Sequence, residues 1–200
     1  EILSLNLLHL DGVLYHPRKV LRGVDDSVVK VVSGKTQIIR RSRGYVPSPI
    51  FFDTAVDKPN LLAAGGDLKN TFCLCQGNRV VLSQHFGDLE ETAVKNLYQT
   101  SIKDLTGLFK IQPNIAVCDL HPGYYSTKVI KELDIPITYV QHHHAHIASV
   151  MAEHNLNAAI GVAFDGTGYG TDGHIWGGEF LICRGADAKR VGQLSYSKLL

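Results

Sequence analysis

The chain has 200 residues, of which 44% are hydrophobic and 20% are charged. Its 20 basic and 19 acidic side chains leave a formal net charge of +1, which excludes the strongly basic surface typical of nucleic-acid-binding proteins. No apolar run approaches the roughly 20 residues of a membrane-spanning helix, and we expect no secretory signal at its start. These numbers predict a globular protein without a nucleic-acid or membrane partner, formed by one domain or by one domain and part of another.

The cysteines and the chain ends add two expectations. The four cysteines are Cys73, Cys75, Cys118 and Cys183. None of them has the C-x-x-C spacing of a zinc site. Reduced, buried thiols are typical of cytoplasmic proteins, so we expect that location. The chain begins at Glu1 and stops at Leu200 within a patterned segment, so we expect it to be a piece of a longer protein.

The N-terminal region is expected to form a β-hairpin over residues 25–42, because two β-rich runs flank a turn containing Gly34. The basic strip that follows is either a solvated strand end or a contact for an anion or nucleotide, and it comprises Arg40, Arg41 and Arg43. Prolines then interrupt all periodicity, which predicts a linker over residues 50–60 between residues 1–49 and residues 61–200.

The next region begins with an apolar strand that meets Gly65 and Gly66, followed closely by Lys69 and Asn70. A hairpin of two strands is expected next, over residues 71–76 and 79–83. Asp88 and Glu91 have the spacing of a capping box, and apolar residues then recur at helical spacing until Pro113. We therefore predict an amphipathic helix that begins after this capping box.

From residue 115 onward, strand and helix patterns alternate. The expected strands are 115–120, 137–140, 158–164 and 176–183, and the expected helices are 126–133 and 142–154. A hairpin followed by this alternation predicts an α/β fold with a mixed sheet and flanking helices. Ligands gather at the carboxyl ends of strands in such sheets, and four motifs lie there: Gly65-Gly66, Asp119–Pro122, His142–His146 and Asp165–Gly173.

The histidine-rich segment suggests a metal site. On a helix, His142 and His146 lie four residues apart on one face, and Asp165 follows at the end of an apolar run. Two imidazoles and a carboxylate suit a divalent metal, zinc or iron, and leave positions open for substrate oxygens. A polar cluster at a helix start, or a buried histidine bonded to backbone, explains the same residues without a metal.

The glycine-rich segment from Asp165 to Gly173 suggests phosphate binding, since glycines let backbone amides approach phosphate oxygens. The residues concerned are Gly166, Thr167, Gly168 and Gly170. The segment matches neither the P-loop nor the dinucleotide-binding fingerprint. Together with Gly65, Gly66 and Asn70, and with Lys69 as a point charge, it could clamp phosphate from two sides, whereas a tight hairpin is the simpler alternative.

Several long segments resemble one family in register and in order. Residues 62–72, 82–90, 119–124, 140–147 and 162–180 are similar to the Kae1-like domain of HypF, the hydrogenase maturation carbamoyltransferase family. Upstream, residues 24–29 and 39–47 resemble the end of that family's YrdC-like domain. The resemblance implies that residues 1–49 end a YrdC-like domain and that residues 61–200 form the N-terminal lobe of a Kae1-like domain.

The resemblance also implies an activity. Members of the family use carbamoyl phosphate and ATP, with magnesium, to make carbamoyl-adenylate, and transfer the carbamoyl group to the C-terminal cysteine of the partner protein HypE. The group becomes the cyanide ligand of [NiFe] hydrogenase. The Kae1-like domain has the actin/hexokinase/Hsp70-like fold, and the resemblance assigns His142, His146 and Asp165 to its metal. A further aspartate is expected from a second lobe.

The sequence leaves open the roles of the neighbouring histidines and several alternative functions. Other possible contributors near the metal are His121, His143 and His144, in supporting or proton-transfer roles. The chain lacks the family's acylphosphatase-like and zinc-finger regions, so this piece alone is not expected to perform the whole reaction. The alternatives are a metal hydrolase, a non-catalytic nucleotide-binding module, and a tRNA-modification-type Kae1-like module.

Overall fold

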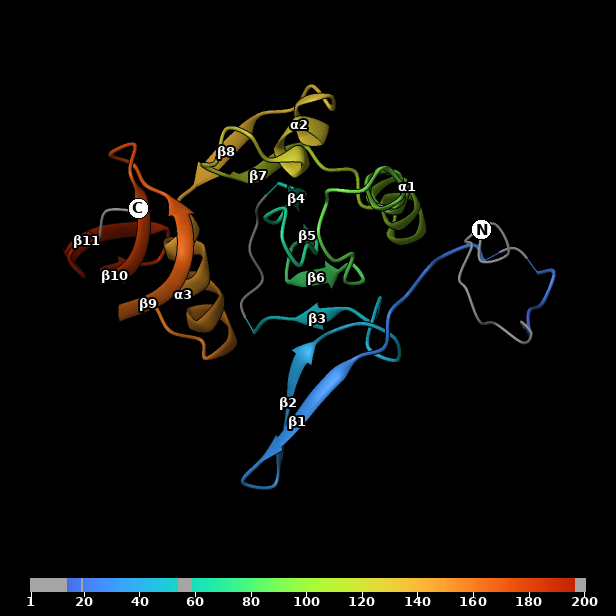
Figure 1. Cartoon of the computed structure of the whole chain (residues 1–200), viewed down its shortest axis with the longest axis horizontal. Helices are drawn as coiled ribbons and strands as arrows, with labels where there is room; N and C mark the ends of the chain where they lie inside the picture. Colours follow the sequence, from blue (N-terminus) through green and yellow to red (C-terminus); the bar gives the residue numbers. More distant parts are fainter. Residues whose placement is uncertain (1–13, 19, 54–58, 197–200) are drawn as a thin grey trace, which may run out of the picture.

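The computed structural model describes residues 14–18, 20–53 and 59–196 (Figure 1). The first elements are strands β1 (Val28–Val32) and β2 (Lys35–Arg40), which form an antiparallel hairpin. Gly34 lies in the turn with a φ of 76°, a conformation that favours glycine. The predicted hairpin is confirmed, and it projects away from the rest of the chain (Figure 1).

A six-stranded mixed sheet forms the centre of the molecule, with the order β3-β6-β5-β4-β7-β8. Its strands are β3 (Ile50–Phe51), β4 (Leu61–Ala63), β5 (Cys73–Gln76), β6 (Arg79–Leu82), β7 (Ile115–Asp119) and β8 (Ile137–Val140). Strands β4, β7 and β8 are parallel, whereas β3, β5 and β6 pair in antiparallel fashion. The expected linker therefore begins with a strand of this sheet, and residues 54–58 within it lie outside the described residues.

Helices α1 (Thr92–Phe109) and α2 (Tyr125–Lys131) pack on this sheet and form the main core. The core combines side chains from four strands with those of both helices: Leu62, Leu74, Val81, Ala116, Tyr98, Ile102, Leu105, Val129 and Ile130. The amphipathic pattern of α1 is thus confirmed, because its buried residues recur at helical spacing. The α/β class predicted from the sequence is correct.

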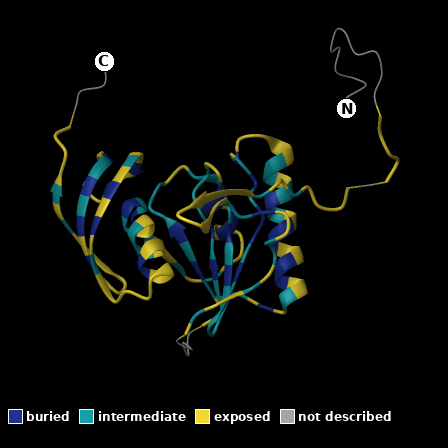
Figure 2. Ribbon diagram, turned by 90° about the horizontal axis from the view of Figure 1, so that it is seen from below, coloured by how far each residue is buried: buried dark blue, intermediate teal, exposed yellow. Residues whose placement is uncertain are grey.

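Helix α3 (His142–Glu153) packs on a second, three-stranded antiparallel sheet of order β11-β10-β9. Its strands are β9 (Ala158–Tyr169), β10 (Ile175–Arg184) and β11 (Asp187–Gln193). Buried and exposed residues alternate along β9 and β10, as Figure 2 shows, because one face of this sheet meets α3. At Gly161 an added Cβ would lie 2.5 Å from Cγ1 of Ile147, so helix and strand are in close contact.

Two sequence-based expectations about this part of the chain were wrong. The strand expected over 158–164 does not extend the mixed sheet, because its backbone pairs with β10 instead. It also continues to Tyr169, so the glycines expected in a loop lie largely within a strand. The physical reason is the short return after Tyr169, which lets β9 and β10 pair along their whole length.

The predicted capping box is also wrong. Glu91 occupies the N-cap position of α1 but its side chain makes no capping hydrogen bond. Asp88 instead accepts a hydrogen bond from the backbone N–H of Lys69, at 2.8 Å. Lys69 has a left-handed φ of 48°, and the Asp88 carboxylate holds this turn rather than the helix start.

The described part of the chain contains no helix with both the length and the apolarity that crossing a bilayer requires. Cys73 and Cys75 lie on β5 as expected and are half-buried, whereas Cys118 and Cys183 are buried thiols.

Candidate metal centre

The start of helix α3 is set by Gln141, which occupies its N-cap position. The Gln141 side-chain oxygen accepts a hydrogen bond from the backbone N–H of His144, at 3.0 Å. Its side-chain nitrogen donates to Nδ1 of His143 at 3.0 Å and lies 3.4 Å from the carbonyl oxygen of Tyr169. One side chain therefore starts the helix and ties its first turn to β9.

His142 and His146 on α3 meet Asp165 on β9. The two Nε2 atoms are 3.2 Å apart, and Oδ2 of Asp165 lies 2.8 Å from that of His142 and 3.4 Å from that of His146. Donor atoms about 2.1 Å from a tetrahedral metal lie roughly 3.4 Å from one another. The three residues predicted from the sequence therefore converge with spacings that fit a small divalent cation.

The donor atoms are also of the types that bind a divalent metal, and an ion can reach them. All three lie within 4.8 Å of one another, and Asp165 and His142 are partly exposed, so an ion has access. Two imidazole nitrogens and one carboxylate oxygen suit zinc or iron and leave coordination positions unfilled. The residues present therefore fit a divalent metal.

A fourth residue, Asp119 at the end of β7, contacts the same histidine. Its Oδ2 lies 2.7 Å from Nδ1 of His142, and its Oδ1 accepts the backbone N–H of His121 at 2.8 Å. The hydrogen bond with Asp119 raises the pKa of His142 above its usual 6.5, and the Asp165 charge acts in the same direction against burial. Sequence reasoning placed Asp119 at a strand end without assigning it to the site.

The pKa of the Asp165 carboxyl is lowered from its usual 3.8. Burial alone would raise it, but the backbone N–H of Gly166 and the charges of His142 and His146 outweigh that effect. Asp165 is therefore held as a carboxylate, the form in which it binds a cation.

The other histidines do not join this cluster within the described residues. His143 is fully buried, its ring lies 6.3 Å from that of Trp176, and burial lowers its pKa. Burial also lowers the pKa of His144. His121 stacks on Tyr124 with ring centroids 4.2 Å apart. His143 has a clear packing role, because an added Cβ at Gly168 would lie 2.4 Å from its Cε1 atom.

The expected phosphate-binding residues fall into separate places. Asn70 is buried, and its amide donates to the carbonyl oxygens of Ala64 and Gly66, so it holds the glycine turn closed. Gly65 has a φ of 73° and admits no side chain, since an added Cβ would lie 2.2 Å from the Thr71 carbonyl oxygen. Both residues thus serve the backbone of this turn.

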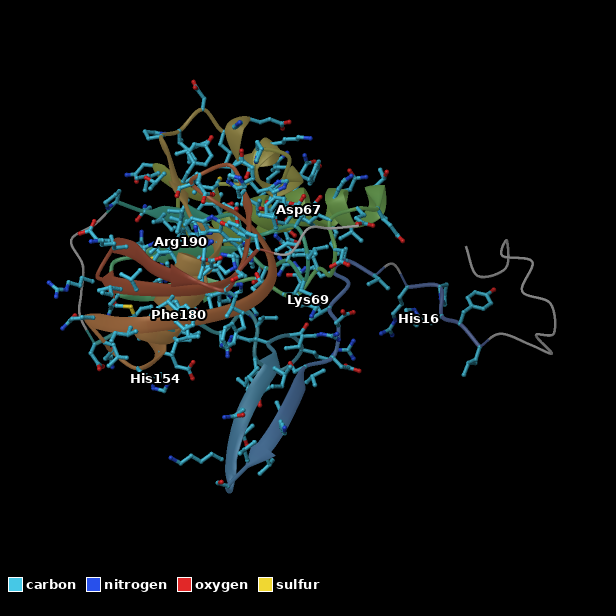
Figure 3. The ribbon with its side chains drawn as sticks, turned by 60° about the vertical axis from the view of Figure 1, so that its left-hand side comes forward. His16, Asp67, Lys69, His154, Phe180 and Arg190 are labelled. Carbon is cyan, nitrogen blue, oxygen red and sulfur yellow. The ribbon has the colours of Figure 1, made fainter. Side chains whose placement is uncertain are left out.

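Lys69 lines a different cavity from His146 and Asp165. It lines a cavity of about 650 Å³ at the base of the β1–β2 hairpin, together with Arg40, Arg41 and His85. Figure 3 shows Lys69 near the hairpin and Asp67 nearer the helices, where the Asp67 carboxylate accepts the backbone N–H groups of Tyr125 and Ser126. The structure does not bring Lys69 together with the β9 glycines.

The residues of the glycine-rich segment 166–170 have mixed surroundings. Gly166 and Thr167 line a cavity of about 270 Å³ beside Glu179, whereas Gly170 faces the Trp176 indole, where an added Cβ would lie 2.1 Å from Nε1. The backbone N–H of Gly166 donates to Oδ1 of Asp165 at 2.7 Å.

Arg190 on β11 was not found by sequence reasoning. Its guanidinium bonds Glu179 at 2.6 Å and Asp172 at 3.2 Å, and lies 4.0 Å from the Trp176 ring centroid. The signal in the sequence was Glu179 within the expected strand 176–183, since a glutamate buried on a strand requires a cationic partner. This network holds the tip of the β9–β10 hairpin.

Two protein-family models match the chain. Residues 56–153 match the HypF Kae1-like domain, and residues 161–200 match the second subdomain of the carbamoyltransferase Kae1-like domain. The chain belongs to the HypF family. The three residues of the candidate metal cluster lie in both matched segments, with His142 and His146 in the first and Asp165 in the second.

Curated relatives in the HypF family share this assignment. The chain is 44% identical over 192 residues to carbamoyltransferase HypF of Synechocystis sp. (strain ATCC 27184 / PCC 6803 / Kazusa), which covers 95% of this chain and 25% of the relative. It is 40% identical over 185 residues to carbamoyltransferase HypF of Rhizobium leguminosarum bv. viciae, over 92% of this chain and 24% of the relative. The chain thus spans about a quarter of the length of these relatives.

Two solved structures resemble the fold. A crystal structure of full-length HypF in a phosphate- and nucleotide-bound form superposes with a TM-score of 0.83 and 47% identity, covering 89% of this chain and 28% of that one. HypF of T. kodakarensis gives a TM-score of 0.81 and 41% identity, covering 91% and 24%. At these identities the likeness supports the same local architecture in this chain.

Proposed function

We propose that His142, His146 and Asp165 hold a divalent metal, zinc or iron, in a carbamoyltransferase of the HypF type. The observation that carries the proposal is the convergence of three ligand atoms from α3 and β9 within 4.8 Å. Asp165 is held ionised, and His142 is oriented by Asp119, so both present the atoms that a cation requires. The names of the relatives support the carbamoyl-transfer chemistry.

We further propose that the whole protein uses carbamoyl phosphate and ATP, through carbamoyl-adenylate, to carbamoylate the C-terminal cysteine of HypE during [NiFe] hydrogenase maturation. When bound, the metal would supply a Lewis acid and a template for the carbamoyl and phosphate oxygens. The phosphate- and nucleotide-bound state of one related structure supports a nucleotide substrate.

The chain's own residues would position that substrate. His142 and His146 fix one side of the site on a helix, and Asp165 closes it from a strand. Gly166 and Thr167 line a separate cavity, and we propose that Thr167 contacts the adenylate phosphate there, because the backbone N–H of Gly166 already donates to Asp165. Lys69, Arg40 and Arg41 face a different cavity, so we propose that they contact anions at the base of the hairpin rather than at the metal.

The domain arrangement is also a proposal. We propose that residues 1–49 end a YrdC-like domain and that residues 61–200 belong to the Kae1-like domain, with the boundary at residues 50–60. The projecting β1–β2 hairpin supports this division, since the matched family segments begin at residue 56.

The metal assignment is tested by metal analysis of the full-length protein. Wild type should contain one equivalent of metal in the Kae1-like domain, and His146→Ala should lose most of it, because one of three ligands is gone. His154→Ala is the matched control, since His154 is the C-cap residue of the same helix and is not part of the cluster. Equal metal content in wild type and His146→Ala would remove the assignment.

A further inference from the structure

The Asp119 carboxylate joins the main sheet to the histidine helix. Asp119 is the last residue of β7, and its side chain is only 9% exposed. Its Oδ1 accepts the backbone N–H of His121, and its Oδ2 lies 2.7 Å from Nδ1 of His142. The backbone N–H that follows β7 therefore holds the Asp119 carboxylate in the position from which it contacts the helix.

This contact decides which nitrogen of His142 can bind a cation. An ionised carboxylate only accepts hydrogen bonds, so Nδ1 of His142 must carry the proton that points at Asp119. Oδ2 of Asp165 lies 2.8 Å from Nε2 of His142, and a cation held between these two atoms would take the place of a proton there, so the Nε2 lone pair is the one that binds it. Asp119 selects the tautomer that places a ligand atom in the cluster.

His146 offers an internal comparison. Its Nε2 atom faces the same cluster, but its side chain is 56% exposed, against 21% for His142. Among the described residues, no carboxylate forms an ion pair with Nδ1 of His146. The two histidines are therefore unequal, with His142 oriented in advance and His146 free to adjust.

We infer that Asp119 is a positioning residue for the metal, acting through His142. The inference rests on the metal site proposed above. Carboxylates that orient a ligating histidine typically change metal affinity by about 10- to 100-fold when they are removed. The role is distinct from ligation, because Asp119 contacts the ring nitrogen opposite the one in the cluster.

The discriminating variant is Asp119→Asn in the full-length protein. Asparagine keeps an oxygen for the His121 N–H, but its amide can donate to Nδ1 of His142 and so favours the tautomer with the proton on Nε2. The matched control is Asp88→Asn, because Asp88 also accepts a backbone N–H and lies outside the cluster.

The readout is the dissociation constant for Zn²⁺, measured by competition with a chromophoric chelator, and the visible spectrum of the Co²⁺-loaded protein. We expect Asp119→Asn to weaken Zn²⁺ binding about 10- to 100-fold while the melting temperature of the chelated protein stays close to that of wild type. Asp88→Asn should bind Zn²⁺ as wild type does. Equal affinity in wild type and Asp119→Asn would overturn the role of Asp119 alone, whereas a wild type that binds no metal would overturn the site itself.

A second measurement covers the case in which Asp119→Asn does not fold. Nitrogen chemical shifts of histidine-labelled, Zn²⁺-loaded wild type report which ring nitrogen of His142 carries the proton and which binds the metal. The inference requires the proton of His142 on Nδ1. A His142 ring with its proton on Nε2 would contradict it.

Discussion

At the scale of single residues, the candidate site depends on close packing around His142. His142 contacts Asp119 and Asp165 through opposite ring nitrogens, and the neighbouring His143 is buried against β9. Gly168 permits this arrangement, because its missing side chain leaves room for both histidines. The glycine that sequence reasoning assigned to phosphate therefore has an evident packing role.

Gly168→Ala should destabilise the protein and disturb the metal site. An added Cβ would lie 2.4 Å from Cε1 of His143 and 3.1 Å from Cβ of His142, which forces one of them to move. Overpacking of this kind costs about 1–3 kcal/mol. Chemical denaturation measures the loss, and Gly166→Ala is the control, since an added Cβ there has no neighbour within 4 Å. Equal unfolding free energies for the two variants would argue against the packing role.

The metal-free protein should show a pH dependence that belongs to His142. Its pKa is raised above 6.5 by Asp119 and Asp165, so its protonated form stabilises the fold below that pH. The stabilisation is lost as the pH rises through the raised value. In the presence of a chelator, the stability of wild type relative to His142→Gln should therefore fall as the pH rises from below 6.5 through the raised pKa of His142. Parallel stability curves for the two proteins would contradict this expectation.

At the scale of elements, the two helices next to the site begin at side chains from different places in the chain. Gln141 caps α3 from within its own segment, whereas α2 is capped by Asp67, which lies 58 residues before Tyr125. The glycine turn at residues 65–66, which follows the carboxyl end of β4, is thereby tied to α2. The position of the turn after β4 thus depends on the hydrogen bonds by which Asp67 caps α2.

Asp67→Ala should destabilise the protein by about 0.5–2 kcal/mol, the usual cost of losing a cap. The Asp67 carboxylate accepts the N–H groups of Tyr125 and Ser126 at 2.7 Å and 3.0 Å. Glu91→Ala is the matched control at the start of α1, because that side chain makes no capping bond. Urea denaturation compares the two, and a cost for Glu91→Ala as large as that for Asp67→Ala would refute the capping argument.

At the scale of the whole molecule, the candidate site lies where two unequal sheets meet. The six-stranded sheet shares a large core with α1 and α2, whereas the three-stranded sheet has a small cluster around Met151, Trp176 and Leu181. The outer face of β9 leaves Ile160 79% and Phe164 72% exposed. Asp165 thus belongs to the part of the chain with less buried apolar surface.

Amide hydrogen exchange should reflect this difference. In metal-free protein we expect faster exchange in β9 and β10 than in β4 and β5, because local stability follows buried apolar contact. Bound metal should slow exchange most in β9 and the first turn of α3, since it links these two elements. A uniform slowing over both sheets would contradict the proposed placement of the metal.

Local pattern was enough to predict much of the fold and the ligand cluster. The hairpin of β1 and β2, the amphipathic helix α1 and the helical pairing of His142 with His146 all follow from the spacing of residues close in sequence. Asp165 was a candidate third ligand because it ends an apolar run, and the resemblance to HypF implied the same assignment. Each of these predictions concerns short-range geometry or a long motif, which sequence records directly.

The tertiary structure decided what depends on distant contacts. The sequence by itself determined which side chains could bind a metal, but not that Asp119 would orient His142, that β9 would pair with β10 outside the mixed sheet, or that Lys69 would lie in another cavity. Strand pairing and side-chain approach are set by packing between elements far apart in the chain, and no local periodicity encodes them. For that reason the types of candidate ligand were predictable from the sequence. Only the folded protein showed which histidine Asp119 orients and which histidines pack elsewhere.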